Sequence, residues 1–189
     1  MFSNKKIVDF FFELGQLRII DHEGWRLIGV EFPESVADHS LRAAQIGFIL
    51  AKLENYENPF EVCSLVIFHD IEECRIGDIH KVANRYVSAD KERAVKEQLK
   101  SLGKIGEEIF KIWKRVNFAE DRAGIIAKDA DLIEQAVTAK EYMEKGYSYA
   151  EDWINNVEKK VKTNSAKKLL KLLRKSDPND WWQGLKKIY

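Results

Sequence analysis

Histidine and carboxylate side chains crowd the stretch IFHDIEECRIGDIH, residues 67–80. His69 and Asp70 follow the apolar run LVIF directly, and such a run is typical of a buried segment. Burying an imidazole and a carboxylate without partners is unfavourable, because neither group recovers the hydration that it loses. Imidazole nitrogen and carboxylate oxygen are both ligands for Zn²⁺, Mn²⁺, Co²⁺ or Fe²⁺. The pair therefore indicates a metal site, to which it contributes two ligands.

Further ligands must come from elsewhere in the chain, which has 4 histidines in all. His22 and His80 lie in segments that are expected to be loops. His39, in VADHS, is the best placed, because its helix has an apolar face that can pack beside the helix leading to His69. A purely structural His–Asp pair without a metal is the alternative at this point.

Helical periodicity dominates the segments that must position these groups, and no hairpin signal interrupts it. We expect a first amphipathic helix over about 4–17, then a loop rich in glycine. Pro33, Glu34 and Ser35 open a helix that runs to about Leu53. A central apolar helix begins at 58–59, carries the His–Asp pair and ends at Gly77. The fold class is therefore all-α.

The second half of the chain continues this pattern. Ser88 is the expected N-cap of the helix in ADKERAVKEQLKSLG, and two further helices cover about 106–116 and 120–145. Residues 150–189 form a lysine-rich amphipathic region, which we expect to pack on the same body with its lysine ammonium groups in water. We see no internal repeat or linker, so residues 1–189 are expected to form a single domain.

Composition limits the classes of partner. Lysine plus arginine, 31, equals aspartate plus glutamate, 31, which argues against a general nucleic-acid binder. No window approaches the roughly 20 apolar residues that span a bilayer, and the first helix lacks the pattern of a signal peptide. Cys63 and Cys74 are expected to be free, buried thiols. We therefore expect a cytoplasmic protein without nucleic-acid or membrane partners.

Three motifs occur in the order ESVADHS, HDIEECRIGDI and KDADLIEQA, and their combination resembles the HD-domain metal-dependent phosphohydrolases. The likeness is closest to the HD-family 5′-deoxynucleotidases and covers about residues 25–144. It implies an HD-domain helical bundle in which His39, His69, Asp70 and Asp131 bind one divalent cation. The ion is expected to be Mn, Co, Zn, Fe, Ni or Mg, because these ligands do not select one metal.

The resemblance also implies roles around the metal. Glu73 becomes the acid or base that handles the proton of the water or the leaving group, and Asp70 assists it as a ligand. Helical projection places Glu72 about 100° away from Glu73, so we expect Glu72 to be solvated. Asp78 matches a position that contacts the sugar. His80 and Lys81, in the adjoining loop, are expected to contact the nucleotide.

At two positions the residues of this chain agree less directly with the family pattern. Trp25 matches a tryptophan that orients the phosphate, but the family often has arginine before it and this chain has Gly24. Arg26 or Arg18 is the expected substitute. Asp131 is expected to be solvent-facing by periodicity alone, since Ile126, Ala130, Ile133 and Val137 lie largely on the opposite side of its helix. Its role as a ligand depends on the resemblance and on small residues that share its face.

The expected function is hydrolysis of nucleoside 5′-monophosphates, especially 2′-deoxynucleotides, to nucleoside and phosphate. A phosphodiesterase or nucleoside triphosphate hydrolase is the enzymatic alternative, because HD phosphohydrolases include both. A non-catalytic module that binds a metal and a nucleotide is the alternative from another class. The resemblance further implies a homodimer, to which the aromatic residues at 10–12 and 181–182 could contribute contacts, although core packing explains these aromatics equally well.

Overall fold

The computed structural model describes residues 4–187, which contain helices and no β-strand. The α-helices are α1 (Asn4–Leu14), α2 (Val36–Leu53), α3 (Pro59–Ile67), α4 (Glu73–Ile76), α5 (Lys91–Leu99), α6 (Lys104–Asn117), α7 (Arg122–Glu144), α8 (Glu151–Glu158) and α9 (Asn164–Leu173). Short 3₁₀ helices, including Glu23–Ile28, join several of them. The all-α prediction is confirmed. Within residues 4–187, every helix is too short or too polar to cross a lipid bilayer.

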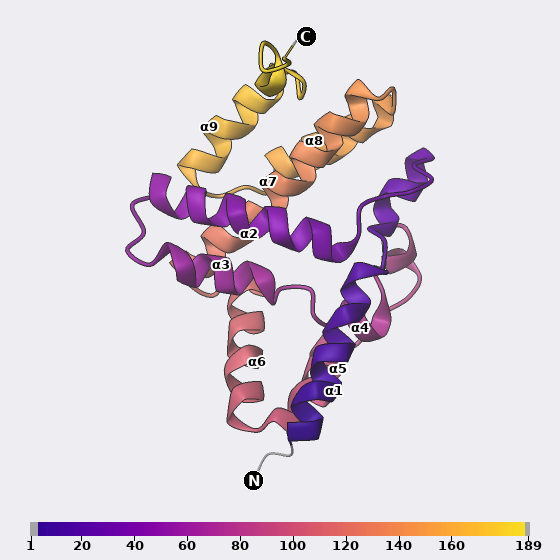
Figure 1. The fold of residues 1–189 in the computed structure, drawn as a ribbon, viewed down its shortest axis with the longest axis vertical. Coiled ribbons are helices and arrows are strands. Elements are labelled where there is room, and N and C mark those ends of the chain that lie inside the picture. Colours follow the sequence, from indigo (N-terminus) through magenta and orange to yellow (C-terminus); the bar gives the residue numbers. More distant parts are fainter. Residues whose placement is uncertain (1–3, 188–189) are drawn as a thin grey trace.

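Helices α2, α3 and α7 form the centre of the molecule (Figure 1). They approach closely because small residues line their contacts. A β-carbon on Gly47 of α2 would lie 3.2 Å from the Cγ1 atom of Val62 in α3 and 3.5 Å from the Cβ atom of Ala130 in α7. Substitution there would force the helices apart, since protein interiors have little free space. This close packing holds His39 of α2 and the chain after α3 within reach of α7.

Two hydrophobic clusters flank the centre. The larger one joins α2, α3 and α7 to α8 and α9, where Ile154, Val157 and Leu170 are buried. The smaller one joins α1, α5 and α6 around Phe10, Leu99 and Trp113, among others. Figure 1 shows α8 and α9 on one side of α2 and α3, and α1, α5 and α6 on the other side. The chain passes from the larger cluster at Leu65 and Val66 to the smaller one at Ile71, so His69 and Asp70 lie between residues of both clusters.

Helix starts follow the local sequence in most cases. Ser35 caps α2 through a reciprocal pair of hydrogen bonds with Asp38, and Asn58 caps α3 just before Pro59. Asp121 caps α7 in the same manner. The Ser88 prediction is wrong, because Asp90 is the N-cap of α5 and its carboxylate accepts a hydrogen bond from the Arg93 N–H. Serine and aspartate are both favoured at an N-cap, so residue type alone does not predict which of Ser88 and Asp90 caps the helix.

The predicted helix through Gly77 is interrupted at the His–Asp motif. Helix α3 ends at Ile67, residues 68–72 form turns, and the short α4 follows and ends at Gly77, where φ is +72°. Ile71 is buried in these turns and packs in the smaller cluster. The turns therefore decide where the acidic side chains point, and the helical projection used for Glu72 and Glu73 does not apply.

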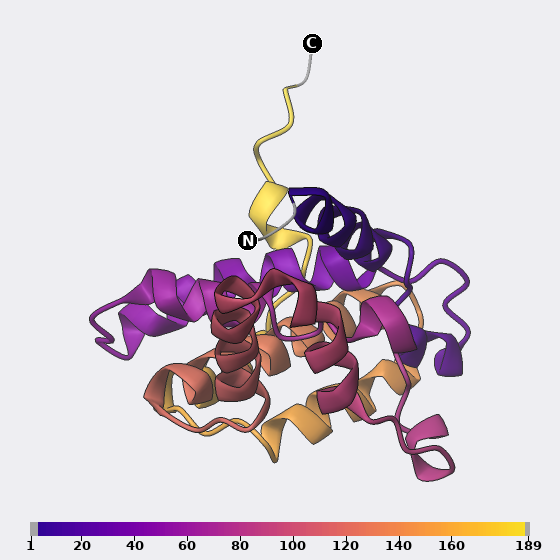
Figure 2. The same cartoon turned by 90° about the horizontal axis from the view of Figure 1, so that it is seen from below.

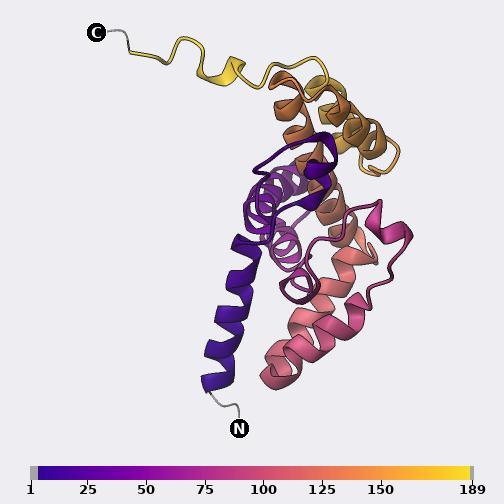
Figure 3. The same ribbon diagram turned by 90° about the vertical axis from the view of Figure 1, so that its right-hand side faces the viewer.

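The C-terminal region has two parts. Helices α8 and α9 pack on α7, as expected for the lysine-rich amphipathic region. The chain beyond α9 extends away from the body (Figures 2 and 3), and Trp181 is 77% exposed. The expectation that residues 150–189 pack on the same body therefore does not hold for 175–187, which have few apolar side chains and no buried one.

Candidate active site

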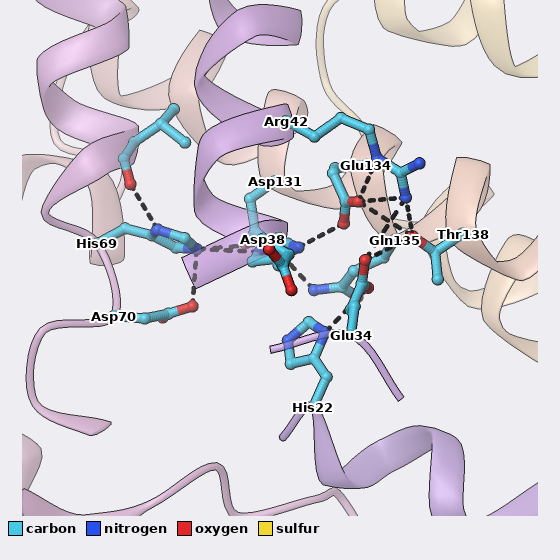
Figure 4. A network of polar contacts seen from close by, with 12 residues as sticks. His22, Glu34, Asp38, Arg42, His69, Asp70, Asp131, Glu134, Gln135 and Thr138 are labelled. Carbon is cyan, nitrogen blue, oxygen red and sulfur yellow. Dashed lines mark hydrogen bonds and ion pairs between the residues drawn. The ribbon is translucent and has the colours of Figure 1, made fainter. Parts of the chain in front are cut away.

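His39, His69 and Asp131 converge from α2, the turn after α3, and α7 (Figure 4). The Nε2 atoms of the two histidines lie 3.3 Å apart, and the Oδ1 atom of Asp131 lies 3.3 Å from His39 Nε2 and 3.8 Å from His69 Nε2. Asp70 joins them, with its Oδ2 atom 2.8 Å from His69 Nε2. Three of the four side chains that the resemblance implied, His39, His69 and Asp131, therefore cluster together, and Asp70 adjoins them through His69.

Asp131 is buried, with 2% of its surface exposed, so the solvent-facing expectation from periodicity is wrong. Helix α7 is buried on nearly all sides. Ile126, Ala130 and Ile133 pack on one side, and Ala127 and Thr138 are buried on the face of Asp131. A helix covered all round has no single apolar stripe, which explains why periodicity misplaced this carboxylate. The expectation of a second close-packed surface is confirmed.

Hydrogen bonds orient both imidazoles toward the cluster. His69 Nδ1 donates to the Val66 carbonyl oxygen at 2.6 Å, and His39 Nδ1 donates to Glu134. Glu134 is held in turn by Arg42 Nε at 2.8 Å and the Thr138 hydroxyl at 3.0 Å. Partners of this kind fix the tautomer of metal-binding histidines. They leave each Nε2 lone pair directed at the other members of the cluster.

The electrostatics of the cluster favour a bound cation. Burial opposes protonation of His39, but hydrogen bonds to Asp131 and Glu134 raise its pKa well above the usual value. Burial also opposes ionisation of Asp131, but Lys128 and the two imidazoles hold its pKa well below the usual value. The carboxylates stay ionised and the cluster stabilises positive charge. Two imidazole nitrogens and the Asp131 carboxylate at these separations, with Asp70 beside them, fit a divalent metal ion.

Glu72 and Glu73 are both buried, so the prediction of a solvated Glu72 is wrong. The turns after α3 direct Glu72 inward, where its carboxylate accepts hydrogen bonds from Trp113 Nε1 at 2.8 Å and Lys91 Nζ at 2.9 Å. Glu73 is different, because its Oε2 atom has no hydrogen-bond partner among residues 4–187. Burial and the nearby charges of Asp70 and Asp78 raise the pKa of Glu73 to about 10.

A cavity of about 370 Å³ opens beside the cluster, lined by residues that include His22, Asp78, His80, Lys81 and Gln135. Gln135 Nε2 donates to Asp131 Oδ1 at 2.9 Å, so the cavity wall reaches the metal site. Asp78 Oδ2 accepts a hydrogen bond from the Glu23 N–H at 2.8 Å. His80 Nδ1 accepts one from the Ala83 N–H at 3.2 Å. Four of the five predicted substrate-binding residues, Trp25, Asp78, His80 and Lys81, thus border one space.

Trp25 and Arg26 have polar partners within the chain. Trp25 lines the cavity but is 1% exposed, and its Nε1 atom donates to Glu34 at 3.3 Å. Arg26 pairs with Asp21, lies 3.2 Å from Glu23 and donates to the Glu31 carbonyl oxygen at 2.9 Å. Its guanidinium is therefore engaged at the exposed surface. Cys63 and Cys74 are free and half-buried, and neither joins a potential metal cluster among residues 4–187.

The sequence and the fold were compared with known proteins. A family model described as HD domain matches residues 14–173. The chain belongs to the HD-domain family. A Dictyostelium discoideum protein named 5′-deoxynucleotidase HDDC2 is 30% identical over 145 residues, covering 71% of this chain and 76% of that protein. Its Xenopus laevis namesake is 28% identical over 166 residues, covering 85% and 82%. The predicted family and its hydrolase class are thereby confirmed.

Solved structures agree with this assignment of the HD-domain protein. A conserved hypothetical protein from Pyrococcus furiosus superimposes with a TM-score of 0.72 at 27% identity. The match covers 89% of this chain and 99% of that one. The range matched by the HD-domain model, residues 14–173, includes α8 and α9.

Sequence reasoning missed Glu134, Arg42 and Gln135 in this HD-domain site. A spacing signal was present for each, because residues three or four apart share a helix face. Glu134 and Gln135 follow Asp131 by three and four residues, and Arg42 follows His39 by three. No comparable signal marked His22, whose ring centroid lies 4.5 Å from that of His39. That contact depends on how the loop after α1 folds back over α2.

Proposed function

We propose that this HD-domain protein hydrolyses nucleoside 5′-monophosphates, preferentially 2′-deoxyribonucleotides, to nucleoside and inorganic phosphate. The observation that carries the proposal is the cluster of His39, His69 and Asp131, with Asp70 beside it, next to a buried carboxyl group with a free oxygen and a cavity of about 370 Å³. The relatives named 5′-deoxynucleotidase support the substrate class.

In this proposal His39, His69, Asp70 and Asp131 hold one divalent cation, one of Mn, Co, Zn, Fe, Ni or Mg. Such an ion, when bound, lowers the pKa of water and offsets negative charge on phosphoryl oxygens. Glu134 and the Val66 carbonyl keep the imidazole Nε2 atoms facing the site. Gln135 holds Asp131 in place through the hydrogen bond to its Oδ1 atom.

Glu73 is the proposed acid and base of the reaction. Water adds to phosphorus, the bond from phosphorus to O5′ breaks, and a proton must move from the water to O5′. The unpartnered Oε2 atom of Glu73 is free to carry this proton, whereas both oxygens of Glu72 are already hydrogen-bonded. Asp70 acts beside it as a metal ligand.

The nucleotide contacts are proposed from the cavity wall. Asp78 uses one oxygen for the Glu23 N–H, which leaves the other to accept a hydrogen bond from a sugar hydroxyl. Lys81 and His80 are proposed to contact the phosphate, and Trp25 contributes to the wall of the same cavity. Arg26 remains the alternative cation, but its three existing partners favour Lys81. Arg18, which is exposed, has less support.

We also propose that the protein is a cytoplasmic homodimer without nucleic-acid or membrane partners. Phe11 and Phe12 support a dimer contact, because they are 62% and 75% exposed on α1. Balanced charge supports the absence of a nucleic-acid partner, since binding to phosphate backbones requires clustered basic residues.

The test is phosphate release from a panel of mono-, tri- and cyclic nucleotides with added Mn²⁺. We expect turnover of 2′-deoxynucleoside monophosphates by the wild type and a loss of about 10²- to 10⁴-fold in Glu73→Gln with metal content unchanged. His69→Ala is expected to lose both metal and turnover. Glu57→Gln, at an exposed position, is the matched control. Cleavage of only tri- or cyclic nucleotides, or no cleavage by the wild type, would overturn the proposal.

A further inference from the structure

The cavity continues from the predicted substrate-binding residues to α8, where Trp153 stacks on Trp25. Asp152, Trp153 and Asn156 of α8 line it there. Asp152 and Asn156 are four residues apart, so their side chains are neighbours on one helix face. Trp153 follows Asp152 in the sequence and is half-buried. This end of the cavity combines an aromatic surface with two polar groups of different hydrogen-bonding type.

The space beside Trp153 is open because residue 24 has no side chain. A β-carbon on Gly24 would lie 3.6 Å from Trp153 Cζ2 and 3.8 Å from its Nε1 atom. A long side chain there would extend over the indole. Trp25 stacks on Trp153 with ring centroids 4.8 Å apart and an interplanar angle of 27°, which holds the indole in place. Trp153 is therefore a fixed surface on which a planar ring can stack.

We infer that this end of the cavity binds the nucleobase and that Asp152 and Asn156 select guanine over thymine. The inference rests on the proposed function, because the phosphate must lie at the metal cluster and the sugar at Asp78. A ligand anchored in this way can reach α8 with its base, because Asp78 and the residues of α8 line the same cavity. The cavity volume of about 370 Å³ is within the range of small-molecule sites.

The selectivity follows from donor and acceptor patterns. An ionised carboxylate accepts hydrogen bonds and cannot donate them. Guanine offers two adjacent donors, N1–H and the exocyclic amino group, so it can bind Asp152 through both carboxylate oxygens. The amide of Asn156 can donate to guanine O6. Thymine offers a single N–H between two carbonyl oxygens, which repel a carboxylate. Adenine and cytosine each offer an amino donor, so their affinity should lie between those of guanine and thymine.

Binding of nucleosides tests this inference without any requirement for catalysis. Calorimetric titration of the wild-type protein with deoxyguanosine and thymidine should give a Kd about tenfold lower for deoxyguanosine, the lower range for one bidentate base contact at an exposed rim. Asp152→Asn should reduce this ratio to near one, and Asn156→Ala should reduce it by a smaller factor. Glu151→Gln makes the same type of change one residue earlier, outside the cavity, and should leave the ratio unchanged.

Turnover adds a second measurement with a substrate that lacks a base. Asp152→Asn should lower kcat/KM for dGMP about tenfold and leave kcat/KM for 2-deoxyribose 5-phosphate unchanged. Equal affinity of the wild type for the two nucleosides overturns the inference, as does an equal loss on dGMP and on the base-free substrate. A wild type that binds deoxyguanosine selectively but releases no phosphate refutes the proposed function and leaves the base site supported.

Discussion

Two arginines each bridge carboxylates from other parts of the fold, and the two networks differ in depth. Arg42 of α2 reaches α7, where it binds Glu134 at 2.7 Å and Glu141 at 2.8 Å. Arg115 of α6 binds Glu61 of α3 at 2.8 Å and Asp121, the N-cap of α7, at 2.6 Å. Glu134 is fully buried, whereas 30% of the Glu61 side chain and 42% of that of Asp121 remain exposed.

The same chemistry therefore has different consequences. Burial raises the cost of ionising Glu134, but His39 and Arg42 together keep its pKa below the usual value. A buried charge that depends on its partners transmits any change directly to His39. In the Arg115 network, water solvates the parts of the two carboxylates that Arg115 does not contact. The contacts link the ends of three helices. The first network supports the site and the second supports the fold.

The largest expected effect comes from breaking the buried network. Glu134→Gln keeps the size of the side chain but removes the charge that orients His39 Nδ1–H. We expect the affinity for Mn²⁺, measured by titration calorimetry, to fall about 10- to 100-fold, as for other partners of metal-binding histidines. Glu141→Gln removes the exposed carboxylate of the same arginine and should change this affinity little. Equal losses in the two variants would contradict the contrast between buried and exposed partners.

A smaller effect is expected at the exposed network. Asp121→Ala removes both the α7 cap and the ion pair with Arg115, and loss of an N-cap costs about 1 kcal/mol. For a chain of this size the Tm should fall by about 2–4 °C in differential scanning calorimetry. Asp121→Asn retains a capping side chain, so its Tm should fall less. The Mn²⁺ affinity of both variants should match that of the wild type. A loss of affinity comparable to that of Glu134→Gln would show that the Arg115 network also supports the site.

The smallest effect concerns acid pH. Burial opposes ionisation of Asp121, but hydrogen bonds from Arg115 and the Gly124 N–H lower its pKa below the ordinary 3.8. A lowered pKa in the folded state stabilises the protein above that ordinary value, and the stabilisation is lost as pH falls further. The difference in Tm between wild type and Asp121→Asn should therefore be constant near neutral pH and shrink below about pH 4. A difference that grows with acidification would contradict this assignment.

The sequence by itself determined the helices, most of their caps and the chemistry available to the site. Ser35, Asn58 and Asp121 cap helices through neighbours three residues away, and such contacts are encoded locally. The order of the His39, His69–Asp70 and Asp131 motifs was enough to identify the family. Local contacts and the order of motifs can be predicted from the sequence because they do not depend on how the helices pack together.

Tertiary structure alone decided which of these groups are buried and where they point. Asp131 and Glu72 were expected in water and lie inside, because α7 is covered on both faces and the chain turns sharply after Ile67. Glu134 meets His39 across 95 positions of sequence, and α8 completes a cavity that begins at α2 and α7. Burial and long-range pairing arise only when separate helices pack, so periodicity within one helix cannot specify them.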